Sequence, residues 1–421
     1  MLERRVGADG DTRLVMLEPV REYAAERLSA SPDASETEQR HARYYLALAE
    51  QAYTELIGVD QVAWGHRVDA DAANLRRALD YGITSDDGAL VVRLAGALEE
   101  WWFDRGLWHE GGRWLVWALA RCDDSTPPAY RARGWLALAY MLWVDEDFAS
   151  ILEAVDHAAA LYATVNDQRG MAWCEIMRSF THHSALEPAA AEAAVDKAIQ
   201  LARHTDDATR GSALRAQAAL MHDDPPQALD VADQAAVMLE RAGDLRSLAR
   251  LWDEIGYLAL EAGAFDDARE LVERALALYE RLEQPADRAT TLASYAIVML
   301  ESGDEEQARW RLHEALERLN ALGIRPYVAE LLLGLAVITA RQGDAEAAGR
   351  LVGAATVMRS ATEQSPLEAR LEATAREAAT DCCSQGSWDA AVADGLALGP
   401  EASIAVGLDA ANAQANPAAA R

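Results

Sequence analysis

The chain has 421 residues, with 69 acidic against 39 basic side chains and a formal net charge of −30. Single globular cores stop growing near ~250 residues, so this length requires several domains or an elongated stack of repeats. An apolar content of 51% with only 12 prolines excludes a disordered chain, and the negative charge disfavours nucleic acid and anionic membranes as direct ligands.

Several features indicate a cytoplasmic protein. Residues 1–6 are rich in charge and lack the apolar core of a secretion signal. The longest apolar runs, 134–144 and 331–340, reach about half of the ~20 residues that a membrane helix needs. The four cysteines are too few for a disulfide scaffold, and adjacent Cys382 and Cys383 do not match the spacing of zinc sites. We therefore expect a reducing location without membrane contact.

The chain begins with a predicted β-hairpin and helix. Two short extended segments flank a Gly/Asp-rich turn at 7–11, and 13–17 is the second strand. Pro19 suits the first turn of the following helix. A linker is expected over 29–35, where Pro32 lies.

Helical spacing of apolar residues then continues with little interruption. Segments 41–56, 60–81 and 88–103 each repeat apolar residues at intervals of three and four. We expect a helical linker over 36–85, followed by the first helices of a repeat array.

An alanine recurs about every forty residues, each time inside an apolar helical stripe. The separations are 40, 40, 37, 40, 40 and 40. These marker alanines are Ala118, Ala158, Ala198, Ala235, Ala275, Ala315 and Ala355. A fixed period of this length predicts an array of about seven helix pairs over 86–360.

Each repeat is predicted as a first helix, a short Gly-Asp type of turn, and a second helix that carries the marker alanine. In the clearest copy the helices are 248–261 and 266–282. In five copies a small residue lies nineteen positions before the marker alanine, where the two helices would pack closely: Ala139, Ala216, Gly256, Ala296 and Ala336.

Beyond the array we expect capping helices and a tail. Segments 367–383 and 387–398 are predicted as capping helices within 361–409, because an array end needs a more polar outer face. Residues 410–421 are predicted to be disordered.

The repeat pattern resembles tetratricopeptide repeats in a forty-residue form, which implies an all-α helical-hairpin solenoid with a right-handed superhelix. Segments 13–28 and 40–50 are similar to the end of the winged-helix domain and the following linker in large bacterial STAND regulators. Segments 74–79 and 101–115 resemble the start of their repeat region. The resemblance implies a winged-helix remnant over 1–30.

In that family an ATPase domain precedes the winged helix, and many members carry a LuxR-type or other DNA-binding domain. The repeat array is the sensor, which binds an inducer or partner and releases the ATPase from autoinhibition. Neither other domain is recognisable here: the only lysine, Lys197, lies mid-helix and not in a phosphate-binding loop, and only Arg421 is basic beyond Arg376.

The resemblance therefore implies the sensor half of a transcription regulator, as a fragment, a truncated product or a free-standing partner. Its expected ligand is a protein or peptide, or a small inducer. No cofactor, nucleic acid or membrane is expected as a partner.

The first helices supply the candidate binding residues. Positions twenty-five residues before the marker alanines would line the concave face of the array. We call these seven positions the first-helix ladder: Arg93, Arg133, Trp173, Arg210, Arg250, Thr290 and Glu330. Stacked arginines of the ladder would bind carboxylates of a peptide or anionic ligand. The alternative is that each arginine pairs with an acidic neighbour. The candidate ligand contacts are Arg93, Arg133, Trp173, Arg210 and Arg250.

Two other clusters have a functional and a structural interpretation. An aromatic cluster favours a buried core over the pocket of a small-molecule sensor: Trp101, Trp102, Phe103, Trp108, Trp114 and Trp117. Two irregular turns carry His182-His183 and His222 with Asp223-Asp224, for which a solvated loop is favoured over a metal site.

Catalysis is not indicated. The chain has no G-x-S-x-G and no H-E-x-x-H sequence, and no motif of paired acids. An uncharacterised all-α enzyme remains the third alternative, after a protein-interaction module and a small-molecule sensor.

Overall fold

The structure is a computed structural model that describes residues 2–6, 12–222, 224–359 and 364–412. In these residues two strands are followed by helices α1 to α21, so the all-α class predicted from the sequence is confirmed. The chain divides into two compact units. Unit 1 contains the residues up to 220 together with 234–247, and unit 2 contains 221–233 together with the residues from 248 onward.

The elements up to residue 219 are β1 Leu2–Val6, β2 Thr12–Met16, α1 Glu18–Ser29, α2 Ala34–Glu55, α3 Gln61–Thr84, α4 Gly88–Ala97, α5 Glu99–Asp104, α6 Trp108–Leu119, α7 Pro128–Leu142, the 3-10 turn Trp143–Asp145, α8 Phe148–Thr164, α9 Gln168–Ser184, α10 Pro188–Ala202 and α11 Asp207–Ala219. The later elements are α12 Pro225–Ala242, α13 Leu245–Glu261, α14 Phe265–Leu282, α15 Pro285–Glu301, α16 Glu305–Leu322, α17 Val328–Arg341, α18 Ala345–Met358, α19 Pro366–Ala379, α20 Gln385–Leu396 and α21 Pro400–Asn412.

The N-terminal hairpin and helix form as predicted. Strands β1 and β2 pair antiparallel, with Leu2 opposite Met16 and Val6 opposite Thr12. The turn expected at 7–11 lies outside the described residues. Helix α1 carries Pro19 in its first turn, where a missing N–H leaves no hydrogen bond unmade.

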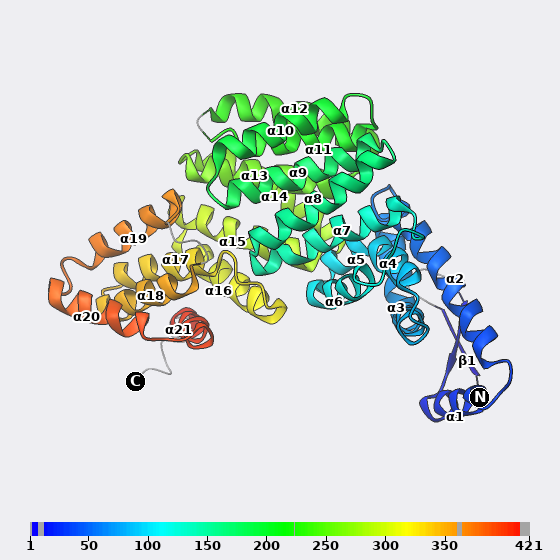
Figure 1. Ribbon diagram of the computed structural model, residues 1–421. Coiled ribbons are helices and arrows are strands. Elements are labelled where there is room, and N and C mark those ends of the chain that lie inside the picture. Colours follow the sequence, from blue (N-terminus) through cyan, green and yellow to red (C-terminus); the bar gives the residue numbers. More distant parts are fainter. Residues whose placement is uncertain (1, 7–11, 223, 360–363, 413–421) are drawn as a thin grey trace. The chain divides into compact units, whose positions relative to one another are not determined.

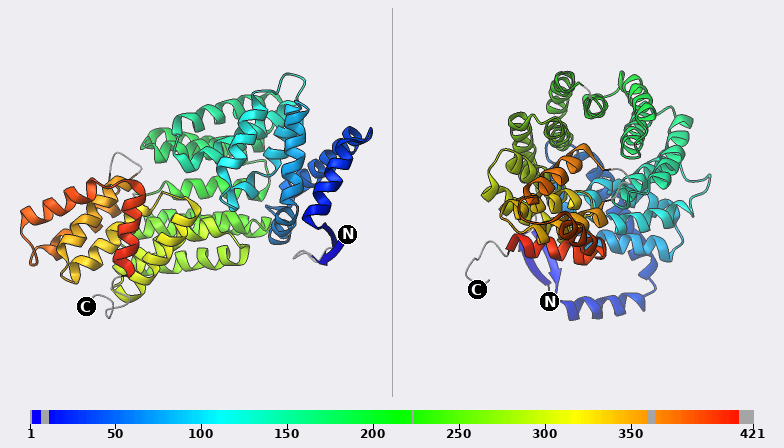
Figure 2. Two further views of the ribbon diagram at one scale, coloured as in Figure 1. Left: turned by 90° about the horizontal axis from the view of Figure 1, so that it is seen from below. Right: turned by 90° about the vertical axis from the view of Figure 1, so that its left-hand side faces the viewer.

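The marker alanines lie at the contacts within the array. All seven have an exposed fraction of 0%. Each sits on the second helix of a pair, and Figures 1 and 2 show successive helices of these pairs running side by side in opposite directions. At the small-residue position Gly256 on α13, an added Cβ would lie 2.7 Å from Val272 Cγ2 on α14. The period in the sequence therefore records close helix packing.

The turns between paired helices follow the predicted capping chemistry. Gly303 and Gly343 adopt φ of +85° and +89°, a left-handed conformation that side chains with a Cβ rarely adopt. The next residues cap the following helices, because Asp304 accepts from the Gln307 N–H at 3.2 Å and Asp344 from the Ala347 N–H at 3.0 Å.

In the core of unit 1, two apolar clusters each join a helix pair to the first helix of the next pair. One cluster joins α7, α8 and α9 around Ile151 and Ala158, and the next joins α9, α10 and α11 around Ile176 and Ala198. Trp173 packs against both. Stability in such a stack is mainly a sum of neighbouring contacts.

Three boundaries differ from the prediction. The helix expected over 88–103 is broken at Leu98 into α4 and α5. The helical linker, expected from residue 36, begins earlier, since its first helix α2 starts at Ala34. A third C-terminal helix, α21, continues to Asn412 and corrects the expectation that the disordered tail starts at Ala410; residues 413–421 lie outside the described part.

Helices α19, α20 and α21 cover the end of the array in unit 2. Helix α19 packs on α17, α20 on α18, and α21 on α16, α17 and α18. Among the described residues, none of the helices has an apolar stretch of the length required to cross a bilayer.

Candidate ligand-binding face of the first helices

The seven positions of the first-helix ladder lie on the first helices of successive pairs, which are, in chain order, α4, α7, α9, α11, α13, α15 and α17. Six of its seven side chains are half-buried, and Glu330 is buried with an exposed fraction of 8%. The ladder side chains are therefore partly packed against their neighbours and are not freely solvated. Four of the seven fall in unit 1 and three in unit 2.

In unit 1 the ladder arginines are held by their own neighbours. Arg93 Nη2 lies 2.7 Å from Glu50 Oε1. The Arg133 guanidinium lies 3.9 Å from the ring centroid of Tyr53, close enough for a cation–π contact. Arg210 forms the most exposed pair, at 3.0 Å from Asp207, and its side chain is 41% exposed. A role of these residues as ligand contacts stays a prediction.

In unit 2 the chemistry of the ladder changes from basic to acidic. Arg250 Nε lies 3.7 Å from Asp287 Oδ1, a distance that permits attraction but not a hydrogen bond. The next positions along the ladder are Thr290 and Glu330. Glu330 Oε1 accepts a hydrogen bond from the Tyr257 hydroxyl at 2.7 Å.

Three first helices carry carboxyl groups at the ladder positions or within one helical turn of them. We call Asp253 and Glu254 on α13, Asp287 on α15 and Glu330 on α17 the acidic cluster. Burial raises the pKa of Asp253 to about 8, with Glu254 and Asp287 acting in the same direction and Thr291 opposing them. Burial also raises the pKa of Glu330 to about 8. Carboxyl groups buried among like charges resist ionisation.

The tyrosine in front of α17 lies where the influence of all four carboxyl groups converges. Burial raises the pKa of Tyr327, and the charges of Asp253, Glu330, Glu254 and Asp287 add to the effect. The Tyr327 and Tyr257 rings meet edge to face with centroids 6.4 Å apart. The charges of the four carboxyl groups therefore all act on Tyr327.

Sequence reasoning identified Glu330 and Arg250 on the ladder but missed Asp253 and Asp287. Both lie three residues from a ladder position, which is the same face of a helix. Extending each ladder position by one helical turn would have found them.

The aromatic cluster belongs mainly to the core of unit 1. The exposed fractions of Trp101, Trp102 and Trp108 are 3%, 0% and 6%. The Trp101 indole donates to Asp69 at 2.7 Å, and the Trp102 indole donates to the Ala95 carbonyl oxygen at 3.2 Å. These side chains pack the start of the array, in line with the interpretation favoured from the sequence.

The histidines on the irregular turns have separate acidic partners. His182 Nδ1 lies 2.6 Å from Glu187, and His222 Nδ1 lies 3.3 Å from Glu261. Asp223 lies outside the described residues. Within the described part of the chain no three His, Cys, Asp or Glu side chains come together in a way that would hold a metal ion.

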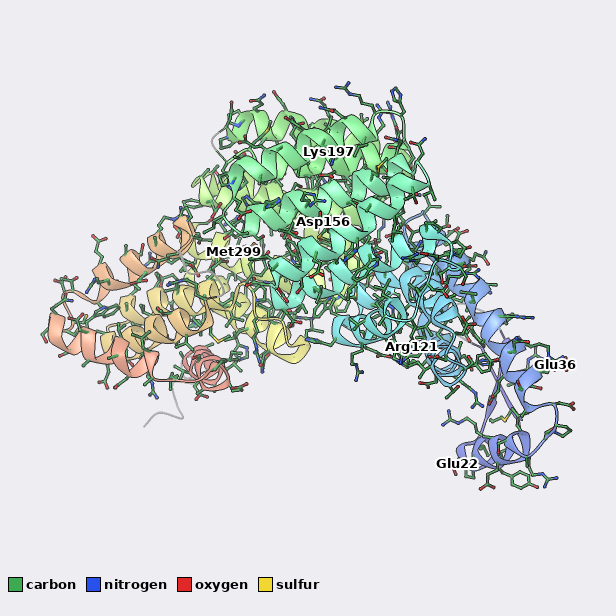
Figure 3. The ribbon with its side chains drawn as sticks, in the orientation of Figure 1. Glu22, Glu36, Arg121, Asp156, Lys197 and Met299 are labelled. Atoms are coloured by element: carbon green, nitrogen blue, oxygen red, sulfur yellow. The ribbon has the colours of Figure 1, made fainter. Side chains whose placement is uncertain are left out.

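A chain of ion pairs connects helices α8, α9 and α10 of unit 1. Arg178 bonds Asp156 at 2.7 Å and lies 3.3 Å from Glu175, which in turn accepts from Lys197 at 2.6 Å. Figure 3 labels the two outer members, Asp156 on α8 and Lys197 on α10. The single lysine of the sequence thus serves helix packing.

Comparisons with known proteins concern one segment of the sequence and the fold of the chain. No protein-family model matches the chain. A segment of 106 residues, 25% of this chain, is 34% identical to proteins named as HTH-type transcriptional regulators in Mycobacterium bovis and Mycobacterium tuberculosis. That segment spans 12% of the length of these relatives.

Among solved structures, a STAND protein with a tetratricopeptide repeat sensor from Pyrococcus horikoshii aligns with a TM-score of 0.54 and 13% identity. The alignment covers 92% of this chain and 55% of that one. A Rap protein in complex with competence and sporulation factor aligns with a TM-score of 0.45 and 14% identity, over 69% of this chain and 93% of that one. The likeness to the first structure shows the fold, an array of tetratricopeptide-like helix pairs.

Proposed function

We propose that the chain is the sensor module of a bacterial STAND-type transcription regulator, a non-enzymatic part that binds a protein or peptide partner, or a small inducer, in the cytoplasm. The observation that carries this proposal is the first-helix ladder: equivalent positions of successive repeats present half-buried charged and aromatic side chains on one set of helices. Repeat arrays use such extended surfaces for binding.

The organisation of the chain supports the same assignment. The hairpin and α1 over 1–30 are proposed to be the remnant of a winged-helix domain, and 36–85 the helical linker. The array of 86–360 and its caps over 361–409 form the sensor. The fold shared with a STAND protein and the short match to HTH-type regulators support a regulatory origin, for which we propose the LuxR-type group.

A peptide-display experiment tests binding on the ladder. Random peptides are selected on the purified chain, and the recovered sequences are synthesised and titrated against variants Arg93→Glu, Arg133→Glu and Arg210→Glu. The matched control is Arg203→Glu, which makes the same charge change at an exposed site at the end of α10. We expect related peptides to be recovered and at least one ladder variant to weaken them by about tenfold, since bonds to charged groups contribute ~1.5–3 kcal/mol.

Two results would count against the proposal. Recovered peptides that bind all four variants as tightly as the original chain would place binding elsewhere. Turnover of nucleoside triphosphates by the purified chain would contradict a non-enzymatic module.

A further inference from the structure

Two adjacent cysteines, Cys382 and Cys383, lie in the turn between the capping helices α19 and α20, and we call them the thiol pair. Both are free cysteines; the side chain of Cys382 is exposed and that of Cys383 is half-buried. Helix α19 ends at Ala379 and α20 begins at Gln385, so the thiol pair belongs to neither helix. Reagents in the solvent can therefore reach it.

The position in a turn decides whether the two sulfurs can react with each other. Neighbouring side chains point to different faces of a helix and to opposite faces of a strand, which keeps adjacent thiols apart. In this turn the backbone is held locally, because the Cys382 and Cys383 N–H groups both donate to the Ala379 carbonyl oxygen, at 3.0 Å and 3.2 Å. The backbone can therefore rearrange here without breaking the hydrogen-bond ladder of a helix or strand.

The other two cysteines of the chain are less available. Cys174 is buried with an exposed fraction of 0%, and Cys122 is half-buried. Burial raises the pKa of Cys174 to about 12 and also raises that of Cys122. Because the thiolate is the nucleophile, both are poor targets for an oxidant. The thiol pair is the place where oxidation should begin.

The chemistry of two adjacent sulfurs favours oxidation over metal binding. A zinc site needs three or four protein ligands. Over the residues that the structure describes, no group of three or more His, Cys, Asp and Glu side chains could hold a metal ion. Oxidation to a disulfide needs only an exposed thiol and a second thiol next to it, which resolves the first oxidation product.

We propose that Cys382 and Cys383 form a reversible oxidation site, which a hydroperoxide converts to a disulfide within the turn. The more exposed Cys382 sulfur attacks one peroxide oxygen; the O–O bond breaks, leaving a sulfenic acid on Cys382 and releasing an alcohol, or water from hydrogen peroxide. The Cys383 sulfur then attacks the Cys382 sulfur. The S–S bond forms, the S–O bond breaks, and water leaves with the Cys383 thiol proton. The two thiols together lose two electrons, which the peroxide gains.

Geometry makes this disulfide easy to reduce. The Cα atoms of adjacent residues are ~3.8 Å apart across a trans peptide, whereas ordinary disulfides join Cα atoms ~4.4–6.8 Å apart. Closure therefore distorts the backbone of the turn. Strained and exposed disulfides are the readily reduced ones, so a small thiol should reopen the ring.

The distortion would occur where the cap meets the array. An added Cβ at Gly343, in the turn between α17 and α18, would lie 4.0 Å from Cys382 Sγ. Helix α19 packs on α17 and α20 packs on α18, so the turn that holds the thiol pair joins two anchored helices. The oxidation site does not depend on the sensor function, and failure of either leaves the other in place.

Mass spectrometry of the full chain tests the proposal. The chain is treated with one equivalent of hydrogen peroxide, alkylated in denaturant and digested with trypsin. Arg376 and Arg421 are the last two basic residues, so both cysteines of the thiol pair fall in one peptide, 377–421. Variants Cys382→Ser and Cys383→Ser each remove one thiol of the pair. The matched control Cys122→Ser makes the same change at a half-buried cysteine outside it.

We expect peptide 377–421 of the original chain and of Cys122→Ser to lose two hydrogen atoms and to escape alkylation, and an excess of dithiothreitol to reverse both effects. The single variants of the pair should instead give a sulfenic acid, trapped by dimedone, or a dimer. Because a tethered thiol acts at a millimolar effective concentration, the ring should form roughly a hundredfold faster than these dimers at ~10 µM protein. A dimer of the original chain as the main product, or equal oxidation of Cys122 or Cys174, overturns the proposal.

Hydrogen exchange tests the distortion separately. In the oxidised original chain, exchange should become faster in the turn 380–384, because the two bonds to the Ala379 carbonyl oxygen are disturbed, while α17 keeps its protection. Peroxide-treated Cys383→Ser should show no such change. Unchanged exchange in a chain that carries the disulfide would overturn the inferred distortion of the turn.

Discussion

A marker alanine sets the distance between two helices through its small side chain. Ala275 on α14 has an exposed fraction of 0%, so any larger side chain must displace its neighbours. We expect Ala275→Leu to lower the free energy of unfolding by about 1–3 kcal/mol. Ala277 lies on the same helix but is exposed, and Ala277→Leu should change stability by no more than about 0.5 kcal/mol. Urea denaturation followed by circular dichroism checks both; equal losses would show that position 275 is not a packing contact.

The acidic cluster makes stability depend on pH in a defined direction. Asp253 and Glu330 have a pKa of about 8 in the folded chain, against ordinary values of 3.8 and 4.5. Between these limits the folded state keeps protons that the unfolded chain has lost, so stability falls as pH rises from about 5 to about 8. The slope from each group is at most about 1.4 kcal/mol per pH unit.

The double variant Asp253→Asn, Glu330→Gln should flatten this fall, because amides do not titrate. Urea denaturation at a series of pH values measures the slope for the variant and for the original chain. Parallel curves would mean that neither carboxyl group holds a proton in the folded state near neutral pH.

Residue-scale prediction from the sequence succeeded where the signal is local and failed where it is not. The spacing of Ala275 and its equivalents is visible because every repeat must solve the same packing problem. The partner of Glu330 is the hydroxyl of Tyr257, 73 residues earlier, and no periodicity specifies that contact. The acidic cluster therefore became visible only when successive first helices were placed side by side.

At the scale of elements, a close contact between Gly353 on α18 and Gly395 on α20 joins the array to its cap. Helices α18 and α20 approach so closely that an added Cβ at Gly353 would lie 2.2 Å from the Val392 carbonyl oxygen and 2.7 Å from the Leu396 nitrogen. Both are backbone atoms, which a rotamer change cannot move. Gly353→Ala should therefore separate the helices and cost about 1–3 kcal/mol or more.

The control for this prediction is Gly386→Ala in α20, where an added Cβ meets nothing within 4 Å. Alanine favours a helix over glycine by up to about 1 kcal/mol, so this variant should be neutral or stabilising. Thermal unfolding of the two variants separates the effects, and a stable Gly353→Ala chain would show that the cap does not depend on the close approach.

Element boundaries were predicted within a few residues, except where tertiary contacts decide them. The spacing of apolar residues over 88–103 is that of one continuous helix, yet the chain breaks at Leu98. Next to the break the Trp102 indole donates to the Ala95 carbonyl oxygen, which lies in the last turn of α4. That bond depends on how the indole is buried, and a pattern of polar and apolar residues does not specify it.

At the scale of the whole molecule, unit 1 contains contacts between residues that are far apart in its sequence. Arg246, whose side chain is 4% exposed, bonds the carboxylates of Glu100 and Asp104, which precede it by 146 and 142 residues. At the same turn, an added Cβ at Gly243 would lie 2.7 Å from Val59 Cγ1. A repeat stack without such contacts would have only neighbour interactions, so this bridge couples helices that are distant in the sequence.

Removing the arginine should loosen unit 1 at both sides of the bridge. Arg246→Met leaves Glu100 and Asp104 partly or wholly buried without their cation, and breaking a buried pair in this way costs about 3–5 kcal/mol. The triple variant with Glu100→Gln and Asp104→Asn should recover part of that loss, because no charge is then left uncompensated. Hydrogen exchange should rise in α5 and at the start of α13 in Arg246→Met, while α8 and α9 keep their protection if coupling is confined to the bridge. Faster exchange throughout α7 to α11 would instead show that the bridge makes unit 1 unfold as one cooperative body, and unchanged exchange everywhere would mean that the long-range pair contributes nothing to its stability.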